Sequence, residues 1–82
     1  MTNREIRALL QRVDARQLRE DAGISSYTVQ RALGITKNQL SFWERGKRYP
    51  SGDGGLRWIR FTAGLARHAE VTAEIAAMRD AA

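Results

Sequence analysis

Residues 23–46 read GISSYTVQRALGITKNQLSFWERG, and this stretch predicts two short helices joined by one tight turn. Ser25 or Ser26 can cap the first helix, because a serine hydroxyl accepts a hydrogen bond from a backbone N–H of the first turn. Gly34 can supply the left-handed residue that ends this helix. The apolar residues of the helix share one side and are expected to face a core: Val29, Ala32 and Leu33.

The second helix of the pair is predicted to begin at Lys37. Thr36, followed three residues later by Gln39, fits a capping box, in which each residue binds the backbone N–H of the other. The helix is expected to run to about Arg45 and to stop at Gly46. Two short helices joined in this way form a helix-turn-helix pattern.

Successive residues of an α-helix are rotated by about 100° about the helix axis, and this rotation divides the residues of the second helix between two sides. Leu40 and Trp43 fall on one side, which is expected to pack on the core. The outward arc holds polar, basic and aromatic residues: Lys37, Asn38, Ser41, Phe42 and Arg45. Such a face can enter a DNA major groove, although charge and periodicity alone equally fit a solvated helix in a small bundle.

Four short motifs and one proline occupy this region: Gly23-Ile24-Ser25, Leu33-Gly34-Ile35-Thr36, Leu40-Ser41, Trp43-Glu44-Arg45-Gly46 and Pro50. Through them the chain resembles the lambda-repressor/Cro helix-turn-helix family of bacterial and phage regulators. The resemblance covers about Ala15 to Leu65. It implies an all-α fold, a compact bundle of five to six helices, that binds double-stranded DNA.

Two positions depart from the family pattern. Ser26 stands where the family usually has Gln, and Gln30 stands where it usually has a small Ala, so Gln30 must find room between the helices. The resemblance also implies that an Arg of the preceding helix, either Arg16 or Arg19, pairs with Glu44. We therefore interpret Glu44 as structural, because a guanidinium neutralises an acid that would otherwise repel phosphate.

The expected DNA contacts divide into base and phosphate contacts. The base-contacting residues are expected to be Lys37, Asn38, Ser41 and Phe42. Asn38 suits adenine, Lys37 suits guanine, and Phe42 either touches a thymine methyl or folds onto Tyr49. The phosphate-contacting residues are expected to be Ser26, Tyr27, Arg45, Lys47, Arg48 and Tyr49. For the basic turn at residues 47–49 a solvated loop is an equal alternative, and Tyr49 can donate its hydroxyl or pack as a lid.

The charge distribution supports a nucleic-acid partner. The 82 residues carry a net charge of +5, divided as +2 over residues 1–35, +4 over residues 36–60 and −1 over residues 61–82. The excess therefore lies on the expected recognition helix and the segment after it.

Other function classes find little support in the sequence. The chain has no cysteine, one histidine and no constellation of catalytic groups, so we expect no enzyme, no metal and no cofactor. We also expect no membrane partner and no small-molecule ligand, in a cytoplasmic protein of a bacterial or infected host cell.

Two helices are predicted before the motif. The first, capped by Thr2 or Asn3, places Ile6, Leu9, Leu10 and Val13 on one face. Its outer residues Arg4, Arg7 and Arg12 could touch DNA, lie on an anionic membrane or stay solvated, and solvation is favoured. The second helix, residues 15–22, is expected to bury Ala15, Leu18 and Ala22.

A central helix is predicted after the motif, from about Gly54 to Arg67, with Ser51 or Asp53 as its cap. It is apolar on almost every side, so it should pack beneath the motif with Trp43 and Trp58 in one core. Its stripes are Leu56, Ile59, Ala63 and Ala66 on one side and Trp58, Phe61 and Leu65 on another.

The segment 69–82 is predicted to form its own helix and to contact a second copy: either the chain bends near Ala69 to Thr72, or the stripe of this segment faces a partner. Its stripe is Val71, Ile75 and Met78, which points away from the core-facing side of the preceding helix. The alternative is a monomer in which this stripe folds back on the N-terminal helix.

The sequence thus predicts one domain over residues 1–82, with a helix-turn-helix at about 25–45. Its expected function is transcriptional regulation, as a phage or prophage repressor or Cro-like switch protein. Two alternatives stay open: the antitoxin of a toxin–antitoxin pair, and an architectural or recombination accessory protein that binds DNA.

Overall fold

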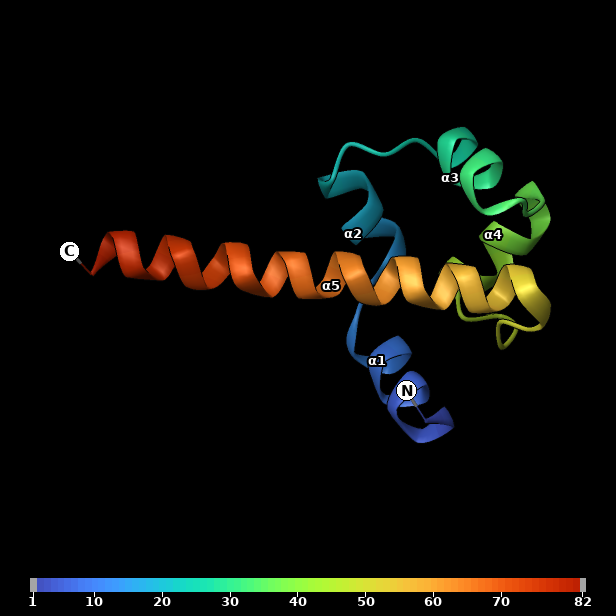
Figure 1. Cartoon of the computed structure of the whole chain (residues 1–82), viewed down its shortest axis with the longest axis horizontal. Helices are drawn as coiled ribbons and strands as arrows, with labels where there is room; N and C mark the ends of the chain where they lie inside the picture. Colours follow the sequence, from blue (N-terminus) through green and yellow to red (C-terminus); the bar gives the residue numbers. More distant parts are fainter. Residues whose placement is uncertain (1, 82) are drawn as a thin grey trace.

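The computed structural model describes residues 2–81, and within them it consists of five helices connected by short loops (Figure 1). In chain order they are α1 (Asn3–Arg12), α2 (Ala15–Asp21), α3 (Ser26–Leu33), α4 (Lys37–Glu44) and α5 (Gly52–Asp80). The four short helices gather around the first half of α5, whose second half projects away from them. The predicted all-α fold with an extra N-terminal helix is confirmed.

The starts of the short helices follow the caps in the sequence. Thr2 and Glu5 form a capping box on α1, and Ser25 accepts a hydrogen bond from the Thr28 N–H at the start of α3. The capping box of Thr36 and Gln39 at α4 is present as predicted. These local bonds satisfy backbone N–H groups that have no partner inside the helix. Asp14, a cap that the sequence reading missed, does the same for α2.

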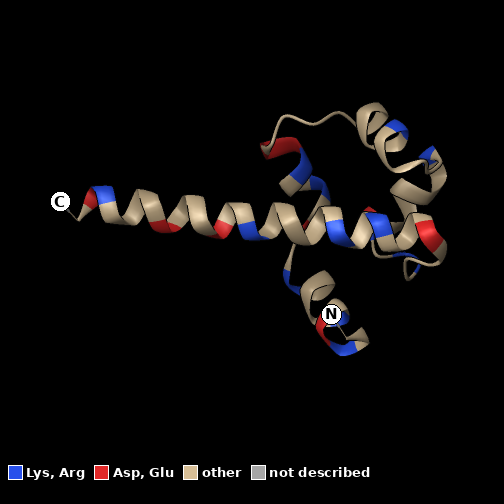
Figure 2. Cartoon of the chain, in the orientation of Figure 1, with Lys and Arg blue, Asp and Glu red and all other residues tan. Residues whose placement is uncertain are grey.

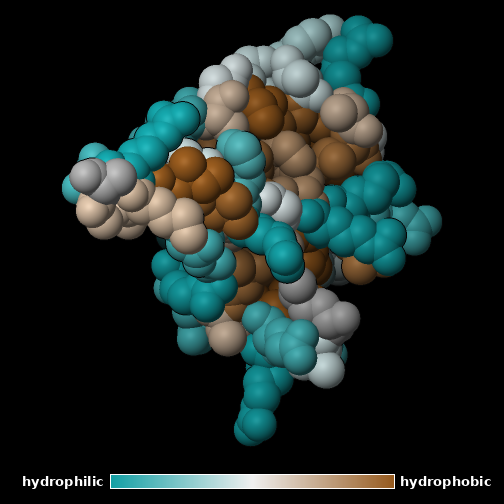
Figure 3. All heavy atoms as spheres, turned by 60° about the vertical axis from the view of Figure 1, so that its left-hand side comes forward, coloured by the Kyte–Doolittle hydropathy of each residue, from teal (hydrophilic) through white to brown (hydrophobic). Residues whose placement is uncertain are grey.

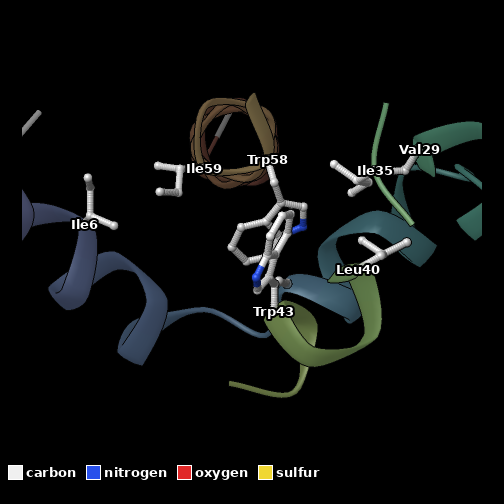
Figure 4. Close-up of a cluster of buried hydrophobic side chains, with 8 residues drawn as sticks. Ile6, Val29, Ile35, Leu40, Trp43, Trp58 and Ile59 are labelled. Carbon is white, nitrogen blue, oxygen red and sulfur yellow. The ribbon is translucent and has the colours of Figure 1, made fainter. Parts of the chain in front are cut away.

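The core lies between α5 and the other helices. Trp43 of α4 and Trp58 of α5 meet there, with ring centroids 5.8 Å apart and planes tilted by 50° (Figure 4). Around them lie the other buried members of the cluster: Ile6, Ala15, Val29, Ile35, Leu40 and Ile59. This confirms that α5 is the central helix and that both tryptophans share one core.

Two glycines let the first turn of α5 approach the motif closely. A Cβ on Gly55 would lie 2.7 Å from the carbonyl carbon of Pro50, and one on Gly54 would lie 2.9 Å from Cγ2 of Ile35. Both distances are too short for a side chain, so glycine is required by packing here. The helix begins at Gly52, two residues before the expected start, and its N-cap Ser51 makes no side-chain cap bond.

Some residues that were expected to be buried are exposed. Leu56 is 45% exposed, because at about 100° per residue it lies roughly a quarter turn away from the buried line of α5. Ala22 is exposed because it is the C-cap of α2, where the chain turns away into Gly23. Ala32 is exposed as well, and Leu18 is half-buried.

The prediction of a separate C-terminal helix is wrong. α5 continues from Gly52 to Asp80 without a bend at Ala69 to Thr72. Between Leu65 and Ala81 the chain has neither Gly nor Pro and contains many good helix formers, so nothing in this stretch interrupts the helix. The alternative in which the stripe folds back on α1 is also wrong, because Val71, Ile75 and Met78 are all exposed. Ala82, the last residue of the predicted segment, lies outside the described residues.

None of the helices within residues 2–81 is long and apolar enough to cross a membrane.

Candidate nucleic-acid interface

The fold presents one side of α4 to solvent and holds the other in the core. Leu40 is 2% exposed and Trp43 is 6% exposed, whereas Lys37 and Asn38 are exposed on the first turn. Gln39 is held by its capping role, since its Oε1 accepts a hydrogen bond from the Thr36 N–H at 2.9 Å. The first turn of α4 therefore offers two free polar side chains on a fixed backbone.

A buried ion pair ties α2 to the end of α4. The Arg19 guanidinium donates to both Glu44 carboxylate oxygens, at 2.7 and 3.3 Å, and to the Ile24 carbonyl at 2.9 Å. The hydrogen bond to Glu44 raises the pKa of Arg19, although burial acts in the opposite direction. Arg16 instead pairs with Glu20 on the surface of α2. Of the two arginines that the resemblance allowed, Arg19 is thus the partner of Glu44.

Arg57 is a structural residue of the motif that the sequence reading missed. From α5 its Nε donates to the carbonyl oxygen of Leu33, in the last turn of α3, at 2.7 Å. This carbonyl is one of the groups that a helix end leaves without a partner inside the helix. The bond fastens the turn between α3 and α4 to the central helix. The two residues are 24 positions apart, so no local pattern could have indicated it.

The two departures from the family pattern bind each other. Gln30 Nε2 donates to the Ser26 hydroxyl oxygen at 3.0 Å, and both side chains are partly exposed at the surface of α3. Gln30 therefore finds room at the surface, and the Ser26 hydroxyl keeps its own proton for another acceptor. Tyr27 lies farther out, 64% exposed, with its hydroxyl bound by Arg31 at 3.0 Å.

Phe42 lies beside two arginines. Its half-buried ring packs against the core, and the guanidinium carbons of Arg48 and Arg45 lie 4.8 and 5.8 Å from its centroid. Tyr49 is found elsewhere, 44% exposed and beneath the guanidinium of Arg7 at 5.7 Å. Within residues 2–81 the aromatic pair is that of Trp43 and Trp58, so Phe42 does not stack on Tyr49. Tyr49 borders a hollow together with Trp43 and Trp58, and its role as a lid on the core stays a prediction. The aromatic rings instead stack with the cations that flank them.

Six of the ten predicted contact residues border two hollows on the surface. Ser26, Lys37, Ser41 and Arg45 border one hollow of about 420 Å³ between α2, α3 and α4. Arg48 and Tyr49 border a second hollow of about 290 Å³, beyond the end of α4. Lysine and arginine are distributed around the motif, whereas both signs of charge occur along the projecting half of α5 (Figure 2).

Comparison with known proteins agrees with this geometry. Residues 16–53 match a family model described as helix-turn-helix, which spans α2, α3, α4 and the start of α5. Helix α1 and most of α5 lie outside the match. No curated protein and no solved structure matches the chain. The match over residues 16–53 supports a DNA-binding helix-turn-helix motif and is consistent with the lambda-repressor/Cro family that the sequence resembles.

Proposed function

We propose that this protein is a sequence-specific transcriptional regulator, a repressor or Cro-like switch of phage or prophage type, whose α4 reads the DNA major groove. The observation that carries the proposal is the exposed first turn of α4, where Lys37 and Asn38 are free on a helix fixed by buried Leu40 and Trp43. Residues near the start of a recognition helix are those that reach base edges in this class of motif. The neutralised Glu44 removes the main repulsion from phosphate.

The proposed contacts are of two kinds, to bases and to phosphates. Lys37, Asn38, Ser41 and Phe42 contact bases, with the accessible edge of Phe42 against a thymine methyl. Ser26, Tyr27, Arg45, Lys47, Arg48 and Tyr49 contact phosphates and provide affinity that does not depend on sequence. Arg45 and Arg48 are well suited to this role, because stacking on Phe42 limits the motion of both guanidinium groups.

Asn38→Ala tests the base-reading proposal. We expect the variant to lose about 1 to 3 kcal/mol of binding free energy on its preferred site and much less on random DNA, because Asn38 would bind a base edge. The preferred site is first obtained by selection from random sequences, and affinities are then measured on both DNAs. Lys47→Gln is the control, since a phosphate contact should weaken binding equally on both. Equal losses for Asn38→Ala would contradict base reading.

We further propose that a second copy of the chain pairs along the projecting half of α5. Exposed residues recur there at alternating spacings of four and three, at Gly64, His68, Val71, Ile75 and Met78. Val71 and Ile75 are 44% and 49% exposed, and Figure 3 shows apolar side chains at the surface of this half. Alternating spacings of this kind mark the seam of a two-stranded coiled coil.

The charges beside the seam favour a parallel pair. Glu74 and Arg79 occupy flanking positions five residues apart, and in a parallel coiled coil such residues face each other across the two chains. The two-fold axis would then run along α5 and relate two recognition helices at the same end of the dimer. A dimer of this kind reads two half-sites about 34 Å apart. Because the seam is short, the two chains should associate weakly in solution. Their association becomes stronger on DNA, where both half-sites are bound at the same time.

Ile75→Asp tests the dimer. The variant places one aspartate from each chain in the centre of the seam, where the two charges repel each other. We expect it to sediment as a monomer at high micromolar concentration and to bind an operator with two half-sites more weakly. Binding to a single half-site should not change. Ala73→Asp is the matched control, because it adds the same charge on the opposite side of α5, where it is exposed. A wild-type protein that is monomeric and binds a site without two-fold symmetry would contradict the dimer.

The same stripe supports a second candidate function. An antitoxin uses an apolar segment to bind its toxin, and the exposed Val71, Ile75 and Met78 offer such a segment. Under this alternative, the wild-type chain is a monomer, and the toxin encoded by a neighbouring gene binds α5. Ile75→Asp should then abolish binding of that toxin. An architectural role has no such observation in its favour, and DNA fragments with permuted binding sites would detect the bending that it requires.

A further inference from the structure

We infer that α1 binds the DNA backbone beyond the end of the recognition helix, through Arg4 and Arg7. This inference rests on the proposed function. It adds a contact surface from a helix that lies outside the matched residues 16–53. The partner is the phosphate backbone of the same DNA duplex that α4 would read.

The first observation is the contact between α1 and the basic loop after α4. The Arg7 guanidinium carbon lies 5.7 Å from the centroid of the Tyr49 ring. Arg7 and Arg48 also border the same hollow, together with Tyr49. One side of α1 therefore continues the surface on which the phosphate contacts of residues 47–49 are proposed.

The second observation is that the cations of this side have no acidic partner. The salt bridges within residues 2–81 are Arg12–Glu70, Arg16–Glu20 and Arg19–Glu44, so neither Arg4 nor Arg7 has a carboxylate oxygen within 4.0 Å. Arg4 and Arg7 border one shallow hollow along α1 together with Gln11. Since they are three residues apart, they lie on one face of the helix. Both are exposed and thus free to approach an external anion.

The third observation separates DNA from an anionic membrane as the partner. A helix that lies on a membrane inserts an apolar face between the lipids. The apolar face of α1 is already used, because Ile6 and Leu9 are each 7% exposed in the protein core. The polar face carries a hydrogen-bonding residue, Gln11, and two cations instead. Such a face suits phosphates that are held at the protein surface.

Together with the loop, α1 completes a basic surface of five cations. Arg4 and Arg7 border one hollow, and Arg7 borders the next with Arg48. Arg48 shares the Phe42 ring with Arg45 and follows Lys47 in the loop. Each cation that neutralises a phosphate releases condensed counterions, so the number of contacts can be counted from the salt dependence of binding. Contacts from Arg4 and Arg7 should therefore add about two to the slope of that dependence.

The test uses the double variant Arg4→Gln/Arg7→Gln in the full chain, with binding to random and preferred DNA measured over a series of salt concentrations. We expect the slope of log affinity against log salt to become shallower by about two on both DNAs. Circular dichroism and thermal melting should stay unchanged, since both side chains are exposed. Lys47→Gln is the positive control and should make the slope shallower by about one.

The matched control is Arg12→Gln/Arg67→Gln. It removes the same net charge from a different hollow, between α1 and α5, which Arg12 and Arg67 border together with Glu70, and it should leave the slope unchanged. An unchanged slope in Arg4→Gln/Arg7→Gln, with the expected change in Lys47→Gln, overturns the inference and leaves the proposed function in place. Equal changes in both double variants also overturn it, because they would report net charge alone. If the wild-type protein binds no DNA, both the inference and the proposed function fail.

Discussion

Replacing Arg19 by Met is expected to lower the free energy of unfolding by about 3 to 5 kcal/mol at neutral pH. The Arg19 and Glu44 side chains are only 9% and 8% exposed. Removal of the guanidinium leaves the Glu44 carboxylate buried without its cation and the Ile24 carbonyl without its donor. A buried charge that loses its partner costs more than the pair contributes, because the desolvation penalty is no longer offset. Urea denaturation, followed by circular dichroism, measures the change.

Two further variants make this prediction specific. Arg19→Met/Glu44→Met should recover most of the lost stability, since apolar side chains of similar volume can replace a buried ion pair at little cost. Arg16→Met removes the surface pair with Glu20, whose side chains are 68% and 46% exposed, and should cost no more than about 0.5 kcal/mol. Equal small losses for Arg19→Met and Arg16→Met would show that the Arg19–Glu44 pair behaves as a solvated one.

Trp58→Ala is expected to lower the free energy of unfolding by about 3 to 5 kcal/mol, because it leaves a large cavity in the core. Trp58 is 1% exposed and packs against Trp43 of α4. The variant should also weaken DNA binding, since the inner side of α4 loses its support. Urea denaturation gives the stability, and the fluorescence of the remaining Trp43 reports its exposure to water.

Leu56→Ala is the matched control for Trp58→Ala. Leu56 lies two residues earlier on α5 but is 45% exposed, so its truncation should cost under about 1 kcal/mol. A loss from Leu56→Ala as large as that from Trp58→Ala would contradict the core described above. Trp58→Phe should lie between the two, because a phenyl ring refills part of the cavity.

The motif could be predicted from sequence because its determinants are local. The capping box of Thr36 and Gln39 and the left-handed Gly34, with a φ of 65°, act within a few residues of each helix end. The inward positions of Leu40 and Trp43 follow from helical phase alone. The family resemblance then narrowed the partner of Glu44 to two arginines, and only the packing of α2 on α4 selected Arg19.

The remaining features depend on contacts between distant residues. The bond from Arg57 to the Leu33 carbonyl and the stacking of Arg7 on Tyr49 each join residues more than twenty positions apart. The continuity of α5 was missed for a different reason. A change in the direction of an apolar stripe predicts either a bend or a stripe that faces away from the core, and helical phase alone does not choose between them. The structure has one continuous helix whose second stripe is exposed. The DNA contacts themselves stay predictions.

The last buried residue of α5 is Ala66, and every described residue after it is exposed. The chain is therefore divided into a part whose side chains are fixed by packing and a part on which packing places no demand beyond helix formation. Substitutions after Ala66 can change the surface of this helix, while the core that holds α4 keeps its shape. The exposed half of α5 and the motif can thus change independently of each other in evolution, through substitutions in two separate stretches of the sequence.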